Sequence, residues 1–76
     1  MNYKTTDFYL SCFLTLSNQE IKEIRRVGNS NQMEFVFTDS EKLRQLMDNY
    51  FWNKAQVDPV AFKDQIRKMK SMLFNY

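Results

Sequence analysis

The sequence predicts an α+β fold in which a β-hairpin packs against three helices, in the chain order α-β-β-α-α. A long apolar run near the start has the composition of a buried element, and a turn cluster in the middle precedes a strict alternation of apolar and polar residues. Two amphipathic segments with helix-start signals come after it. With 76 residues, one Gly and one Pro, the chain predicts a single domain, 1–76, made almost entirely of regular elements.

The first predicted element is a helix over Phe8–Leu16. Thr5-Thr6-Asp7 in front of it offers side chains that can cap a helix N-terminus. The segment is apolar on almost every side, which favours a helix buried on several faces, although its aromatic content also permits a buried strand. Ser17-Asn18 is expected to end it, because Asn tolerates the left-handed conformation.

The next segment, Glu20–Val27, fits either a helix or a strand. Ser17-x-x-Glu20 resembles a capping box and an apolar residue recurs at every third position, which favours a short helix. The strand interpretation depends on the residues after Val27. Gly28–Asn31 is a turn cluster, and Met33–Thr38 alternates with period two and needs a partner strand. We therefore predict a strand over Ile21–Val27 and a hairpin.

Two helices complete the predicted fold. Thr38-x-x-Glu41 is a capping box, with Asp39 as a rival cap. The apolar face of the helix that begins there consists of Leu43, Leu46, Met47, Tyr50 and Phe51. Asp58-Pro59 starts the last helix, because Asp caps and Pro suits the first helical position. Its core stripe is predicted to be Phe62, Ile66, Met69 and Leu73.

The composition argues against catalysis. The chain has no histidine and one cysteine, so the commonest general base, metal ligand and nucleophile pair are missing. Its carboxylates have no metal-loop spacing, so we expect no catalytic residue, no metal and no cofactor. Cys12 is expected to be a small buried hydrophobe. Twelve aromatics and five methionines are instead typical of a protein that packs and binds.

The chain also predicts a location. One cysteine cannot form an internal disulfide, no signal peptide is recognised, and the run of about nine apolar residues is far short of the ~20 that span a bilayer. We expect a soluble, cytoplasmic protein without membrane contact, in the cytoplasm of the host if a phage encodes it. Its oligomeric state is left open.

Positive charge gathers in two places that could bind a partner. Net charge is only +2, but residues 1–40 carry a net −1 and residues 41–76 a net +3. Lys63, Arg67 and Lys70 share one face of the last helix, where they could grip phosphates or an acidic partner, or simply form a solvated face. Arg25 and Arg26 on the hairpin could contact nucleic acid, or protect a strand edge from aggregation. On a regular strand, Lys22 and Arg26 would share one face and Arg25 would point to the other.

Tyr50-Phe51-Trp52 places three aromatics in consecutive positions at a helix end. One helix face cannot bury all three. Tyr50 and Phe51 are expected to close the core. Trp52 either joins them or stays exposed as an anchor for a partner, since indole buries a large area while its N–H keeps a polar contact.

Four pieces of the chain together resemble a family of small, single-domain bacterial and phage proteins classed as a domain of unknown function. They are Thr6–Leu14, Glu34–Ser40, Tyr50–Asn53 with Val57-Asp58-Pro59 and Phe62, and Lys70–Phe74. In that family a Gly commonly follows the first apolar segment. Asn18 stands in its place here, which favours a strand over Ile21–Val27. The resemblance implies a compact accessory protein, often of viral or mobile-element origin, and supplies no catalytic residue or ligand.

These observations lead to two functional hypotheses. The first is a non-catalytic accessory protein of a phage or mobile element that binds or inhibits a host protein. The second is a small nucleic-acid-binding protein that uses Lys63, Arg67 and Lys70 with the hairpin arginines. The salt dependence of the binding affinity separates the two hypotheses. Affinity for nucleic acid falls steeply as salt increases, because binding releases counterions.

Overall fold

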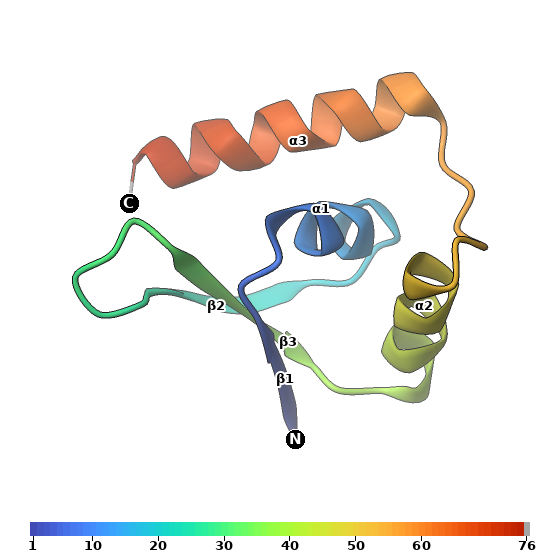
Figure 1. Cartoon of the computed structure of the whole chain (residues 1–76), viewed down its shortest axis with the longest axis horizontal. Helices are drawn as coiled ribbons and strands as arrows, with labels where there is room; N and C mark the ends of the chain where they lie inside the picture. Colours follow the sequence, from blue (N-terminus) through green and yellow to red (C-terminus); the bar gives the residue numbers. More distant parts are fainter. Residues whose placement is uncertain (76) are drawn as a thin grey trace.

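A three-stranded antiparallel sheet lies beneath three helices in the computed structural model, which describes residues 1–75. The element bounds in chain order are β1 (Asn2–Thr5), α1 (Phe8–Leu16), β2 (Ile21–Arg26), β3 (Met33–Thr38), α2 (Glu41–Phe51) and α3 (Pro59–Phe74). Figure 1 shows α1 between the sheet and α3, with α2 at one end of the molecule. The predicted α+β class, the hairpin and the three helices are all present.

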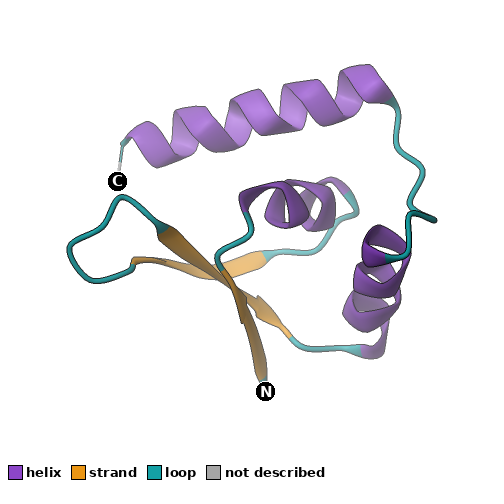
Figure 2. Ribbon diagram, viewed as in Figure 1, coloured by secondary structure: helices purple, strands orange, loops and turns teal. Residues whose placement is uncertain are grey.

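The sheet has the order β1-β3-β2, so β3 is its centre (Figure 2). The N-terminal strand β1 was not predicted. Only Tyr3 is apolar in Asn2–Thr5, so the segment has almost no alternation to recognise. The segment forms a strand because it pairs with the free edge of β3, where Tyr3 lies opposite Phe37 and Thr5 opposite Phe35. Tertiary pairing therefore makes a strand of a segment that local pattern leaves undefined.

The helix α1 is buried on nearly all sides, as its composition predicts. Five consecutive residues are buried, namely Leu10, Ser11, Cys12, Phe13 and Leu14. The buried Ser11 hydroxyl donates to the Asp7 carbonyl oxygen at 2.9 Å, which satisfies it within the helix. Asp7 also caps the N-terminus, because its Oδ1 accepts from the Leu10 amide at 3.0 Å. Asn18 comes after the helix with φ of 69°, the left-handed conformation expected there.

The hairpin forms as predicted, with a turn at Gly28–Asn31. Phe35 and Phe37 of β3 point towards the helices, where both join the core. The Val27 amide donates to the Gln32 carbonyl at 2.9 Å and closes the turn. A β-bulge lies between Ile21 and Glu23 of β2. Because a bulge adds one residue to a strand, it changes which side chains share a face.

The cap of α2 differs from the prediction. Ser40 caps the helix, since its Oγ accepts from the Leu43 amide at 3.0 Å. Thr38 cannot serve, because it belongs to β3 and pairs with Asn2 of β1. The other predicted cap, Asp39, is held instead by the Arg44 guanidinium at 2.8 Å.

The helix α3 begins as predicted and buries one stripe. Asp58 Oδ2 accepts from the Ala61 amide at 2.8 Å, and Pro59 occupies the first turn. Met69 is buried, while Phe62, Ile66 and Leu73 are half-buried against the core. Gln65 ties α3 to α1, because its Nε2 donates to the Thr15 hydroxyl at 2.8 Å.

Candidate binding surface

The end of α2 carries aromatic side chains that the fold does not bury. Trp52 is 73% exposed and Phe51 is 55% exposed. Tyr50, by contrast, is half-buried, with its ring centroid 5.5 Å from that of Phe13 in α1. The prediction that Tyr50 closes the core is confirmed, and the same prediction for Phe51 is wrong. Phe51 lies about 100° further around the helix than Tyr50, at the edge of the face that Leu43, Leu46, Met47 and Tyr50 turn to the core.

The backbone holds Trp52 in a defined place. Its amide donates to the Asp48 carbonyl at 3.0 Å, and the amides of Lys54 and Ala55 both donate to the Asn49 carbonyl, at 2.7 and 3.0 Å. Asn53 adopts the left-handed conformation with φ of 58°, which ends the helix. The indole is therefore carried on a hydrogen-bonded turn, which lowers the backbone entropy lost when a partner binds there.

A hollow of about 440 Å³ lies beside this turn. It is lined by Phe13, Tyr50, Asn53, Ala55, Val57 and Phe62. None of these side chains is charged. Burial raises the pKa of the Tyr50 phenol, with smaller contributions from Asp7 and Cys12, so the hydroxyl stays neutral well above physiological pH. We use the name aromatic patch for this hollow and the exposed residues Phe51, Trp52 and Val60 at the ends of the two helices that line it; by helical spacing Trp52 and Val60 lie about 160° around their helices from the lining residues Tyr50 and Phe62. Val60, at the start of α3, is 58% exposed.

The contributions of Val57 and Val60 to this surface were not predicted from the sequence. The sequence gives no periodic apolar pattern that includes either, because both are isolated apolar residues beside Asp58-Pro59. Helical spacing offers a signal for Val60: it lies about 160° around α3 from Phe62, the first residue of the core stripe.

The chain also exposes more surface than its size requires, 5527 Å² for 9.3 kDa. A folded monomer of this mass is expected to expose about 5,000 Å².

The three cations of α3 lie together along one flank of the helix, beside its core stripe. Lys63, Arg67 and Lys70 are all exposed. Over residues 1–75, none of them makes an ion pair. We call these three residues the basic stripe. The structure therefore brings them together as the sequence predicted.

The hairpin arginines do not join the basic stripe. Arg25 Nε is 3.1 Å from Glu23 Oε1, so its charge is neutralised within β2. Arg26 donates to the Ser30 carbonyl oxygen in the turn at 3.4 Å. The predicted face assignment is wrong, because the bulge places Arg25 opposite Glu34 and Arg26 opposite Met33, whose side chain packs on the core. Arg25 thus lies on the open face of the sheet and Arg26 on the helix side.

Lys22 is on the open face of the sheet with Arg25, and not with Arg26 as predicted. Its Nζ donates to Asn2 Oδ1 at 3.1 Å. Since β3 lies between β1 and β2, this bond crosses the central strand on the open face of the sheet. The Lys22 amine is therefore engaged within the sheet.

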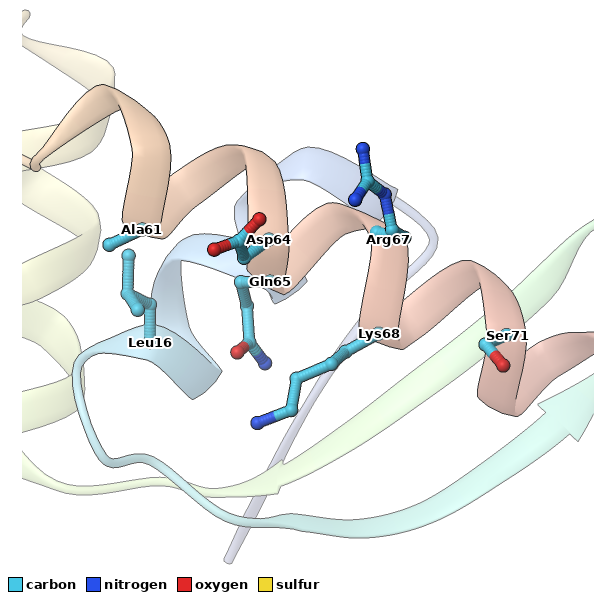
Figure 3. A pocket seen from close by; sticks show the side chains of 7 residues that line it. All are labelled: Leu16, Ala61, Asp64, Gln65, Arg67, Lys68 and Ser71. Carbon is cyan, nitrogen blue, oxygen red and sulfur yellow. The ribbon is translucent and has the colours of Figure 1, made fainter.

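A second hollow, a groove of about 600 Å³, lies between the end of α1 and α3 (Figure 3). Leu16 and Ala61 form part of its wall. Figure 3 shows the Arg67 guanidinium directed away from the groove, while Lys68 extends along the side of α3 that faces α1. Both residues line the groove, but their charged ends point in different directions.

Cys12 is buried, as predicted, and burial raises the pKa of its thiol to about 11. A thiol protonated at physiological pH is a poor nucleophile. Among residues 1–75 there is no group of three His, Cys, Asp or Glu side chains placed to hold a metal ion. No helix in the same range is long and apolar enough to cross a membrane.

Comparison with protein families matches residues 1–75 to the model described as "Domain of unknown function (DUF5659)". The chain belongs to this family. Neither the curated proteins nor the solved structures include a match. The DUF5659 match runs from β1 to α3, so the aromatic patch and the basic stripe both lie within the family's domain. It agrees with the resemblance to a small domain family of unknown function.

Proposed function

We propose that this protein is a non-catalytic binding protein that recognises a partner protein through the aromatic patch, with Trp52 as the anchor. The observation that supports this best is the exposure of Trp52 and Phe51, at 73% and 55%, at the end of α2, the helix whose Tyr50 lines an uncharged hollow. In a small protein, exposed aromatics that cluster on an ordered turn are typical of an interaction site. Trp is also the residue type most enriched among the few interface residues that contribute most of the binding energy.

More specifically, we propose that the protein is an accessory factor of a phage or mobile element that binds or inhibits a host protein. Its support is the small size of the domain, the lack of histidine and the resemblance to bacterial and phage proteins. A protein of this kind acts by occupying the surface of its target, so it needs an anchor and no catalytic group.

Nucleic-acid binding is the second candidate, and the basic stripe is the observation that favours it. Three exposed cations that make no ion pair with the described part of the chain, residues 1–75, can contact phosphates. The hairpin adds little support, because Arg25 pairs with Glu23 and Lys22 with Asn2.

The test is affinity capture from a lysate of the native host, with the captured proteins identified by mass spectrometry. The wild type is compared with Trp52→Ala and with Tyr9→Ala, which removes a 52% exposed aromatic of α1 that lies outside the aromatic patch. Melting temperatures show that each variant is folded. We expect one host protein to be retained by the wild type and Tyr9→Ala and lost by Trp52→Ala. Equal retention by all three would contradict the proposal, and recovery of nucleic acid that high salt releases would support the alternative.

A further inference from the structure

The basic stripe continues directly from the aromatic patch. Phe62 lines the hollow, and Lys63 is the next residue of α3. Val60, Lys63 and Arg67 are separated by three and four positions, so they occupy one outward face of the helix. The uncharged hollow and the row of cations therefore both begin in the first turns of α3, with Phe62 and Lys63 about 100° apart around the helix.

The stripe has a regular geometry. At a rise of about 1.5 Å per residue, Lys63 and Arg67 are separated by about 6 Å along the helix axis and Arg67 and Lys70 by about 4.5 Å. All three are exposed and, within residues 1–75, make no ion pair. Lys68 is not part of the row, because it extends along the other side of the helix (Figure 3).

We infer that this combined surface binds an acidic, amphipathic helical segment of a partner protein. One apolar side chain of that segment enters the hollow beside Trp52, and its carboxylates lie along Lys63, Arg67 and Lys70. A helix laid along α3 presents acidic side chains at i, i+4 and i+7 with the same axial spacing as the three cations. The inference rests on the proposed function and adds the chemistry of the partner.

A second copy of the chain does not fit this surface as well. The nine acidic residues are spread over the sequence, and two of them, Glu23 and Asp39, are already paired with arginines. A copy that carries the same +2 charge therefore offers no net attraction to the basic stripe.

Nucleic acid fits less well for a different reason. The hollow at the start of α3 has no charged side chain in its lining, so it offers no cation to a phosphate. The remaining cations of the hairpin have partners within the protein.

The test uses a displayed library of random helical peptides that are sixteen residues long, the length of α3. Selection on the wild-type protein is expected to enrich peptides with Asp or Glu at i, i+4 and i+7 and one large apolar residue beyond the acidic row. The dissociation constant of the most enriched peptide is then measured by fluorescence anisotropy. Arg67→Glu, at the centre of the stripe, is expected to weaken binding at least about tenfold, since a reversed charge replaces attraction by repulsion.

The matched control is Lys68→Glu, which makes the same change of charge on the same helix but on the side away from the stripe. It is expected to weaken binding by less than about threefold, and circular dichroism checks that both variants remain helical. Equal losses in the two variants, or enrichment of neutral or basic peptides, would overturn the inference. Tighter binding of duplex DNA than of any selected peptide at physiological salt, or a dimer of the wild type by sedimentation, would also overturn it.

Trp52→Ala separates this inference from the proposed function. If Trp52→Ala abolishes peptide binding and Arg67→Glu does not, the aromatic patch is a binding site and the acidic partner is wrong. If Arg67→Glu abolishes binding and Trp52→Ala does not, the stripe binds acidic peptides and the proposed role of the aromatic patch is wrong. Loss of binding in both variants is the expected result.

Discussion

Replacement of Phe35 by alanine is the sharpest test of the core. Phe35 is 1% exposed and lies on the central strand, with its ring centroid 6.4 Å from that of Phe8. A buried Phe→Ala substitution costs about 3–5 kcal/mol, because it removes apolar contacts and leaves a cavity. At roughly 0.05–0.15 kcal/mol per residue, a chain of this length has a total stability of about 4–11 kcal/mol. The substitution therefore removes a large share of the stability.

The assay is thermal unfolding monitored by circular dichroism. For a domain of this size about 1 kcal/mol corresponds to a shift of about 4–8 °C, so Phe35→Ala is expected to lower the melting temperature by roughly 12–40 °C. Phe51→Ala is the matched control, since it makes the same change at a side chain that is 55% exposed. Its expected cost is about 1 kcal/mol or less. A melting temperature of Phe35→Ala no lower than that of Phe51→Ala would refute the assignment of the core.

Four more predictions concern residues other than Phe35 and Phe51. Ile66→Ala is expected to cost about 1–3 kcal/mol in urea unfolding, less than Phe35→Ala, because Ile66 is only half-buried. Asp58→Ala removes the cap of α3 and is expected to cost about 1 kcal/mol in the same assay; no change would mean that the cap is dispensable. Cys12, with a thiol pKa of about 11, is expected to react with iodoacetamide far more slowly in the native protein than in urea. The hydrogen bond from the Arg44 guanidinium lowers the pKa of the Asp39 carboxyl. The pair therefore stabilises the fold above the ordinary aspartate pKa, and this stabilisation is lost as the pH falls and the carboxyl is protonated. Arg44→Ala should lower the urea midpoint at neutral pH and leave it unchanged in strong acid.

The sequence predicted most elements because their signals are local. The composition of Phe8–Leu16, the alternation in Met33–Thr38 and the Asp58-Pro59 start each depend on neighbouring residues alone. The strand β1 could not be predicted in this way, since Asn2–Thr5 becomes a strand only by pairing with β3. Because the same pairing makes Thr38 part of β3, the cap of α2 is Ser40 and not Thr38.

The candidate surface was predictable in part. Helical spacing alone places Lys63, Arg67 and Lys70 on one face. The exposure of Phe51 and Trp52 depends on how α2 meets α1 and on the turn at Asn53, which spacing does not define. The faces of Lys22, Arg25 and Arg26 were assigned wrongly because a strict period of two holds only without a bulge.

Quenching of tryptophan fluorescence tests the proposed anchor most directly, because Trp52 is the single tryptophan of the chain. We predict that acrylamide quenches the indole of the free protein as efficiently as that of a small peptide, since the side chain is 73% exposed. We also predict strong protection of the indole when the captured host protein is bound. An indole that is already shielded in the free protein, or one that stays equally accessible in the complex, would contradict the role of Trp52 as the anchor.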